Sequence, residues 1–227
     1  MRYLTSLFTL ILMSTAALAA NAKMPAKALC SVCALKGGET ELEKVRAHSQ
    51  HQGKAYYFCS EECKVEFDAD PVAYLPPVFP RPAPAFVIEM LEGGDRSLAD
   101  FRGKIVLVDF WATWCKPCRE TMPRLQKLHS AYAARGFEVL GVSIDEDDNR
   151  IKKIGTMAEK LAISYPIFVD AKQTPAWHQF KVKAIPAMFL LDREGQIVAQ
   201  WTGKIDYEQV EQAVLRRLEP RAEAEGP

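Results

Sequence analysis

The sequence predicts an α/β domain with a mixed sheet, preceded by a small cysteine-rich module. In the C-terminal part of the chain, short apolar runs alternate with amphipathic stretches, which is typical of strands and helices stacked in layers. A segment with five prolines in nine residues, 76–84, separates this part from four upstream cysteines. Lys+Arg and Asp+Glu are equal at 29 each over the 227 residues, so the net charge gives no support to nucleic-acid binding.

The first twenty residues have the pattern of an export signal. Arg2 is the one charged side chain among them, the rest are apolar or hydroxylic, and Ala17 and Ala19 stand where a signal peptidase reads small residues. We predict a cleaved signal peptide at 1–20 and a periplasmic or otherwise extracytoplasmic location, with an uncleaved membrane anchor as the alternative. The charged residues 221–227 are predicted to form a disordered tail.

The proline-rich segment marks a domain boundary. Proline lacks a backbone N–H and favours extended geometry, so residues 76–84 are expected to act as a semi-rigid linker. We predict a cysteine module at 28–75 and a larger domain at 85–220.

In the larger domain, strand and helix signals follow one another in order. Residues 105–110 form a continuous apolar run, as in a strand buried on both faces, and 116–135 has helical spacing with Gly136 as its stop. The runs 187–191 and 196–201 are joined by Asp-Arg-Glu-Gly, which predicts a hairpin. The other predicted elements are strands at 139–144 and 167–169 and helices at 151–161 and 207–218.

Cys115 and Cys118 stand where the first strand gives way to a helix. Unpaired N–H groups and the helix dipole stabilise a thiolate there, which makes Cys115 the nucleophile. Cys118 follows one turn later and can resolve the mixed disulfide. Pro117 suits the first helical turn, where its missing N–H costs nothing. The context predicts dithiol–disulfide exchange, although Cys-x-x-Cys alone would also suit zinc or a structural bridge.

The segment from Val108 to Cys118, VDFWATWCKPC, resembles the active-site segment of thioredoxins. The residues that follow, RETMP, resemble the exported TlpA/ResA-type branch of that superfamily. The resemblance runs from about residue 86 to residue 218. It implies a thioredoxin-like fold, protein disulfide substrates and no organic cofactor.

This resemblance also implies roles for residues around the two cysteines. Asp109 matches the buried acid beneath Cys118, so we expect desolvation to raise its pKa and the carboxylate to accept the Cys118 proton. Pro186 matches the cis-proline that faces the motif and shapes the groove where substrate backbone pairs. The other residues expected in this groove are Trp114, Lys116, Pro117 and Ile185.

The residues between the two cysteines favour a reductase. Lys116-Pro117 resembles the reductant members, whereas a histidine beside the second cysteine would favour an oxidant. A reductase in an oxidising compartment must be kept reduced, which implies a membrane protein that donates thiol electrons. Maturation of apo-cytochrome c, a role of related reductases, is one possible pathway. A peroxidase is disfavoured, because its reactive cysteine would not lie in Trp-Cys-x-x-Cys.

The upstream cysteines have the spacing of metal ligands, Cys30-x2-Cys33 and Cys59-x3-Cys63. Ser60 is expected to cap a short helix running to residue 67, which would project Cys63 toward Cys59. So small a module can build only a small apolar core. We therefore expect a bound metal or disulfide bridges to stabilise its fold. Two disulfides are the alternative to a metal.

The stretch 48–63, together with Phe67 and the Asp-Pro-x-x-Tyr at 70–74, resembles the YHS/TRASH family of heavy-metal-associated modules. This resemblance implies metal binding by Cys59 and Cys63 with one or both of the earlier pair. Thiolates favour Zn²⁺ or Cu(I). Two histidines, His48 and His51, are further candidate ligands.

Two functions therefore remain open. In one, the chain is an enzyme, and its redox domain reduces these four cysteines or those of partners, because thiols must be reduced and deprotonated to bind metal. In the other, it is a metal-binding or metallochaperone protein whose redox domain keeps its own ligands reduced.

Overall fold

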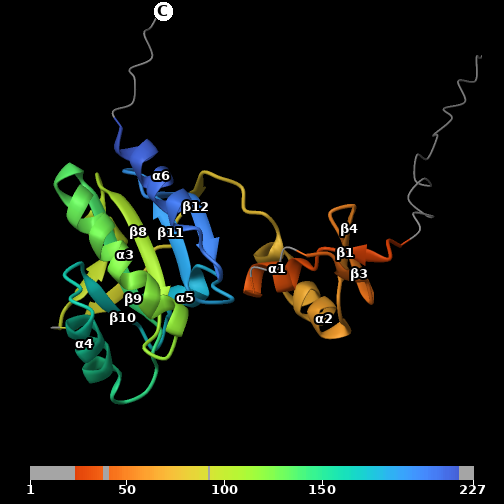
Figure 1. Ribbon diagram of the computed structural model, residues 1–227, viewed down its shortest axis with the longest axis horizontal. Helices are drawn as coiled ribbons and strands as arrows, with labels where there is room; N and C mark the ends of the chain where they lie inside the picture. Colours follow the sequence, from red (N-terminus) through yellow and green to blue (C-terminus); the bar gives the residue numbers. More distant parts are fainter. Residues whose placement is uncertain (1–23, 38–40, 92, 220–227) are drawn as a thin grey trace, which may run out of the picture.

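The computed structural model describes residues 24–37, 41–91 and 93–219, which form a small N-terminal module and a larger layered domain (Figure 1). The predicted signal peptide at 1–20 and the predicted tail at 221–227 lie outside the described residues. Among the helices in the described ranges, none is long and apolar enough to span a membrane.

The larger domain is built on an eight-stranded mixed sheet in the order β5-β12-β11-β8-β9-β10-β6-β7. The central strand β8 (Ile105–Trp111) is buried along its whole length and runs parallel to β9 (Phe137–Ser143), which is parallel to β10 (Ile167–Asp170). On the other side of β8, β11 (Ala187–Leu191) pairs antiparallel and forms a hairpin with β12 (Gln196–Thr202). The predicted α/β class, mixed sheet and terminal hairpin are confirmed.

Helices cover both faces of this sheet. On one face, α3 (Lys116–Tyr132) and α6 (Tyr207–Leu218) share a hydrophobic cluster with alternate residues of β8 and β9 (Figure 1). The opposite face packs against the short helix α5 (Ala176–Gln179) and the segment around Phe86. α4 (Arg150–Lys160) inserts its buried Ile154 into a third cluster that also contains Cys115 and Cys118.

The element boundaries lie close to the predicted ones, with two kinds of difference. The helix predicted to reach residue 135 changes to a 3-10 turn, Ala133–Arg135, and ends at Gly136, whose φ of 85° suits glycine. The sequence does not predict β6 (Val87–Met90) or the edge strand β7 (Asp95–Ser97), which pair with each other at one end of the sheet. Both are short, and charged residues interrupt them, so they lack a continuous apolar run.

Within the segment expected to act as a semi-rigid linker, 76–84, two residues belong to the sheet. Arg81–Pro82 forms β5 and pairs with Gln196 and Ile197 at the edge of β12. An edge strand tolerates proline because one row of its backbone groups needs no partner. The Arg81 side chain also donates to Gln200 Oε1 at 2.8 Å.

The N-terminal module combines two helices and a hairpin. α1 (Ser31–Gly37) and α2 (Glu61–Ala69) pack beside the antiparallel pair β3 (Ala47–His51) and β4 (Lys54–Phe58). A two-residue pair, β1 (Lys27–Ala28) with β2 (Glu43–Lys44), closes the module.

The core of the module is aromatic. Phe67 is fully buried, with ring centroids 4.9 Å from Tyr56 and 5.0 Å from Phe58. As predicted, Ser60 caps α2, and its hydroxyl accepts the Cys63 N–H at 3.3 Å.

A 3-10 turn of the module (η1, Pro71–Tyr74) lies against the larger domain. Asp70, just before this turn, lies 3.4 Å from Lys181 Nζ and 3.7 Å from Lys183 Nζ, and the Lys183 ammonium lies 5.7 Å from the centroid of the Tyr74 ring. The module therefore contacts the loop that leads to Pro186.

Candidate functional site: a helix-capping cysteine pair and a four-thiol cluster

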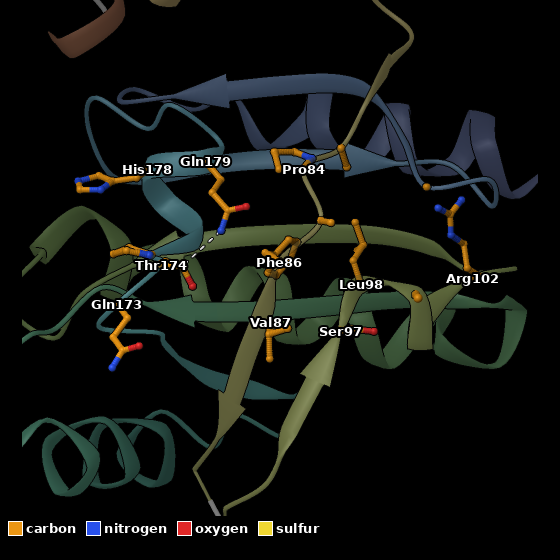
Figure 2. Close-up of a pocket in the computed structure, with 15 residues that line it drawn as sticks. Pro84, Phe86, Val87, Ser97, Leu98, Arg102, Gln173, Thr174, His178 and Gln179 are labelled. Carbon is orange, nitrogen blue, oxygen red and sulfur yellow. Dashed lines mark hydrogen bonds between the residues drawn. The ribbon is translucent and has the colours of Figure 1, made fainter.

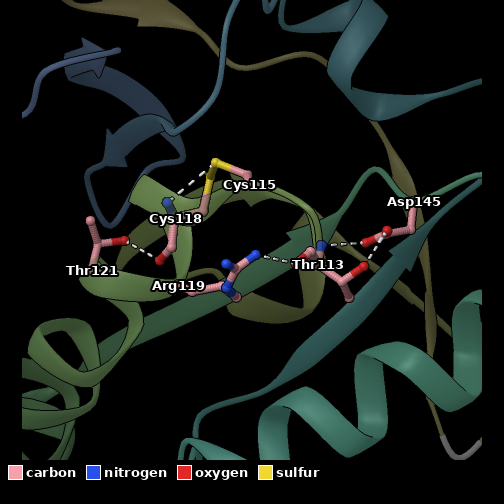
Figure 3. The surroundings of a disulfide bond; sticks show 6 residues. All are labelled: Thr113, Cys115, Cys118, Arg119, Thr121 and Asp145. Atoms are coloured by element: carbon pink, nitrogen blue, oxygen red, sulfur yellow. Dashed lines mark hydrogen bonds between the residues drawn. A yellow bond between two sulfur atoms is a disulfide. The ribbon is translucent and has the colours of Figure 1, made fainter.

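The two downstream cysteines form a disulfide at the N-terminus of α3 (Figure 3). Cys115 is the N-cap, and its sulfur accepts the Cys118 backbone N–H at 3.2 Å. Both cysteines are buried, Cys115 at 5% exposure and Cys118 at 0%. The Cys118 N–H, which donates to the Cys115 sulfur, favours a thiolate on Cys115 after reduction. The positive end of the 17-residue helix α3 has the same effect.

The loop before Cys115 is held by hydrogen bonds at Thr113 (Figure 3). The buried Asp145 carboxylate accepts the Thr113 N–H at 2.8 Å and the Thr113 hydroxyl at 2.7 Å. Arg119 donates from α3 to the Thr113 carbonyl at 2.6 Å, and the Ser143 hydroxyl donates to Asp145 at 2.7 Å. These contacts fix the turn that presents the disulfide.

Asp145 was missed by sequence reasoning, although a signal for it was present. It follows β9, and β9 runs parallel beside β8, whose end carries the cysteine turn. Carboxyl ends of parallel strands meet at one edge of a sheet, which is where sites form in such folds.

The predicted groove residues lie around the disulfide. Trp114 is 67% exposed, and Lys116 and Pro117 are exposed beside it. The Ile185–Pro186 peptide bond is cis, and Ile185 packs against the hydrophobic cluster that contains both cysteines. The structure thus brings the loop at 185–186 and the motif together.

Asp109 lies inside the sheet on β8, fully buried. Among the described residues, neither of its carboxylate oxygens has a hydrogen-bond partner. Burial raises its pKa from 3.8 to about 7. The expected burial and direction of the shift are both present, and a carboxyl that titrates near neutral pH suits a proton acceptor.

A cavity of about 670 Å³ lies elsewhere on the larger domain (Figure 2). Its lining includes Phe86, Leu98, Arg102 and His178, and it contains no cysteine. The thiol chemistry is therefore separate from this cavity.

The four upstream cysteines meet in a second site. Their sulfurs all lie within 4.8 Å of one another, with Cys33 Sγ 3.4 Å from Cys59 Sγ and 3.8 Å from Cys63 Sγ. Tetrahedral Zn²⁺ with Zn–S bonds of about 2.3 Å would place its sulfurs about 3.8 Å apart, so the cluster fits such an ion. The cluster contains neither His48 nor His51.

The thiols of this cluster resist simultaneous ionisation. Burial raises the pKa of Cys59 to about 12 and also raises that of Cys33, and neighbouring thiols add to the shift of Cys33. In Cys30, burial is opposed by backbone N–H groups of Cys33 and Cys59, and the net pKa is lowered. These shifts disfavour several thiolates at once unless a positive charge lies nearby.

Both parts of the chain, the cysteine module and the larger domain, match known protein families. Residues 80–200 match the AhpC/TSA family, and residues 40–78 match the YHS domain. Over 130 residues the chain is 36% identical to thiol-disulfide oxidoreductase ResA of Geobacillus thermodenitrificans, an alignment that covers 57% of this chain and 72% of that protein. It is 35% identical over 130 residues to the thioredoxin-like protein YneN of Bacillus subtilis, covering 57% and 75%.

Solved structures give the same result. A thiol:disulfide interchange protein DsbE from Chlorobium tepidum superposes with a TM-score of 0.56 at 29% identity, over 62% of this chain and 97% of that one. The thioredoxin domain of a Bacteroides vulgatus thiol-disulfide oxidoreductase superposes with a TM-score of 0.54 at 32% identity, over 61% and 99%.

The fold and the cysteine pair define a thioredoxin-like thiol-disulfide oxidoreductase, an enzyme class, here joined to a YHS domain. The chain belongs to the AhpC/TSA family and resembles its ResA-type members.

Proposed function

We propose that this protein is an extracytoplasmic thiol-disulfide reductase that acts on protein disulfides through Cys115 and Cys118. The observation that carries the proposal is the Cys115 sulfur at the N-cap of α3, where it accepts the Cys118 N–H at 3.2 Å beside the exposed Trp114. The export signal predicted at 1–20 and the resemblance to ResA support the location.

The proposed reaction begins with the reduced pair. The Cys115 thiolate attacks one sulfur of the substrate disulfide, and the other substrate sulfur leaves with the electron pair and takes a proton from water. Asp109 then accepts the proton of Cys118, whose thiolate attacks Cys115 Sγ. The Cys115–Cys118 bond forms, the bond to the substrate breaks, and the second substrate sulfur leaves as a thiolate that takes a proton from water. The substrate is reduced by two electrons and the enzyme is oxidised.

The proposed direction rests on Lys116-Pro117 between the cysteines, and it requires a membrane donor of thiol electrons to restore the dithiol. We expect a reduction potential closer to the about −270 mV of thioredoxin than to the about −120 mV of a strong oxidant. Equilibration with glutathione redox buffers measures it. Apo-cytochrome c is one client among the protein disulfides that this chemistry accommodates.

The reductase proposal is tested by reduction of insulin in the presence of dithiothreitol. Full-length protein should accelerate it, and Cys115→Ser should reduce the rate to the uncatalysed level. Ser130→Ala, a substitution on the same helix outside the motif, is the control and should retain full activity. Equal rates for wild type and Cys115→Ser would overturn the proposal.

The four-thiol cluster supports a second proposed function, binding of Zn²⁺ or Cu(I) by Cys30, Cys33, Cys59 and Cys63. A bound ion would supply the positive charge that these crowded thiolates lack, and would stabilise a module with a small core. Reduced full-length protein should retain one ion after gel filtration, and protein lacking residues 28–75 should retain none. Retention of metal by the shortened chain would contradict this assignment.

The two functions would be linked if the redox domain keeps the cluster reduced. We expect oxidised wild-type protein, supplied with dithiothreitol in limiting amount and then with Zn²⁺, to load more metal than Cys115→Ser. Equal loading of the two proteins would exclude this link and leave the redox domain with clients on other chains.

A further inference from the structure

A second cavity, of about 410 Å³, lies where the N-terminal module meets the larger domain. The module and the linker contribute residues of η1 and the segment 75–78, and the larger domain contributes the loop 180–183 with parts of β11 and β12. None of its lining residues is a cysteine, so the thiol chemistry does not account for it. Cavities of about 300–1,000 Å³ at domain interfaces are common sites for small ligands.

The walls of this cavity are mainly apolar. The segment 75–78 contributes a leucine, two prolines and a valine, and the larger domain contributes Phe180 and Val182. Val72, in η1, also lines the cavity, and its side chain is 58% exposed. Apolar side chains that stay exposed inside a cavity favour a ligand with an apolar body.

The charged residues of the lining are all cations, namely Arg81, Lys181 and Lys183, and no carboxylate is among the lining residues. Asp70, next to the cavity, lies 3.4 Å from Lys181 Nζ and 3.7 Å from Lys183 Nζ. Charge-assisted hydrogen bonds are about 2.7–2.9 Å long, so Asp70 pairs with both ammonium groups only loosely. Because an ammonium group has three donors, each lysine keeps donors for a further acceptor.

Arg81 is the lining cation that no carboxylate of the described chain neutralises. Its side chain extends from β5 and donates to the neutral amide of Gln200, which also lines the cavity, at 2.8 Å. Partial burial lowers the pKa of Arg81, and no negative charge among the described residues opposes this shift. Since burial of a charge is costly unless an opposite charge accompanies it, Arg81 favours an anion in the cavity.

We propose that this cavity binds one small amphipathic carboxylate, with its head group on Arg81 and its aliphatic chain against the apolar walls. A guanidinium presents donors in a planar fork that matches a carboxylate, which an ammonium does not. A single negative charge suffices, because Lys181 and Lys183 already share Asp70. The apolar walls exclude a fully polar anion as the preferred ligand.

A bound carboxylate would hold the module against the larger domain. Its chain would contact the segment 75–78, while its head would lie among side chains of the larger domain. A ligand that binds only the assembled cavity stabilises the arrangement of the two parts that forms it. This inference is independent of the exchange chemistry, which takes place at Cys115 and Cys118.

The test is isothermal titration calorimetry of the full-length protein with octanoate. Wild type should bind one equivalent, and Arg81→Gln should weaken binding about tenfold, because a hydrogen bond between two charged groups is lost. Arg96→Gln removes an exposed arginine of β7 outside the cavity lining and should bind octanoate as wild type does. Octanol lacks the charge and acetate lacks the chain, so each should bind at least tenfold more weakly than octanoate.

A second variant, Val72→Asp, tests the apolar wall at a side chain that is largely exposed, where the fold tolerates a polar residue. The added negative charge should also weaken octanoate binding about tenfold. Octanoate should slow the cleavage of residues 76–80 by a protease in wild type and have no such effect in Val72→Asp.

Three results would overturn the inference: no binding of octanoate by wild type, equal affinity in wild type and both cavity variants, or equal affinity for octanoate, octanol and acetate. Insulin reduction by the same samples reports separately on the proposed function. Loss of octanoate binding with normal insulin reduction therefore leaves the reductase proposal intact.

Discussion

Asp109 is the residue whose surroundings depart most from those of an ordinary carboxyl. It is fully buried on β8 without a hydrogen-bond partner in the described part of the chain, and its pKa is raised by burial from 3.8 to about 7. The folded state therefore binds a proton that the unfolded state releases at lower pH. This proton is the link between the stability of the domain and its proposed chemistry.

The pH dependence of stability follows from this shift. Stability contributed by the protonated carboxyl is fully present below about pH 4 and is lost as pH rises through about 7. At about 1.36 kcal/mol per pKa unit, the free energy of unfolding of the oxidised protein should fall by about 4 kcal/mol across this range. Urea unfolding measures it, and Asp109→Asn should remove most of this dependence. An unchanged pH dependence in that variant would contradict the assignment.

Asp145 supports the site from the neighbouring strand end. In Asp145→Ala the Thr113 N–H and hydroxyl lose their acceptor, which should cost about 1–3 kcal/mol of unfolding free energy. Insulin reduction should slow as the turn before Cys115 loosens. Asp148→Ala, a fully exposed carboxylate nearby, is the matched control and should change neither measurement. Identical behaviour of the two variants would show that the Thr113 contacts do not position the disulfide.

At the scale of elements, the packing of β9 against Tyr165 depends on Gly141. Gly141→Ala would place a Cβ 2.7 Å from Ile167 Cδ1 and 3.0 Å from Tyr165 Cε2, so both side chains must shift. We expect a loss of about 1–3 kcal/mol in unfolding free energy. Gly155→Ala is the control, because α4 has open space there and alanine is the better helix former. A stable Gly141→Ala protein would show that Ile167 and Tyr165 can move aside at little cost.

The elements also show how far sequence reasoning reaches. A continuous apolar run is typical of a strand buried on both faces, so the sequence predicts β8 directly. Local chemistry likewise predicts the helix cap at Ser60 and the turn at Gly136. It does not predict β6, β7 or α5, since these short elements exist through pairing and packing with distant segments.

The same limit applies to the site. Cys115, Cys118 and Asp109 lie within eleven residues of one another, so a local motif reveals them. Asp145 reaches the site only through the order of the strands, because β9 lies beside β8. No local pattern distinguishes an aspartate that holds the cysteine turn from one on the surface.

At the scale of the whole molecule, the module meets the larger domain next to the loop that carries Pro186. α2 holds Cys63 in its first turn and Glu66 one turn later, and Glu66 accepts hydrogen bonds from Tyr74 and Lys36. Tyr74 in turn contacts Lys183. The helix that carries Cys63 is thus connected through Glu66 and Tyr74 to Lys183, two residues before Ile185.

Asp70 is the charged residue at this junction. Its pairs with Lys181 and Lys183 are partly exposed, so Asp70→Ala should change the overall unfolding free energy by less than about 1 kcal/mol. The connection at residues 76–80 should nevertheless be cleaved faster by a protease, because the module is held less firmly. Asp68→Ala, which breaks a pair with Lys64 inside the module, is the control. Equal cleavage rates would show that Asp70 does not hold the module in place.

The central claim is that Cys115 attacks and Cys118 resolves, and trapping of the mixed disulfide tests it most directly. Reduced Cys118→Ser protein, exposed to disulfide-bearing proteins and analysed by peptide mass mapping, should carry its partner on Cys115. Cys115→Ser, treated in the same way, should carry none. Partners attached to the upstream cysteines alone, or equally on both variants, would contradict the account.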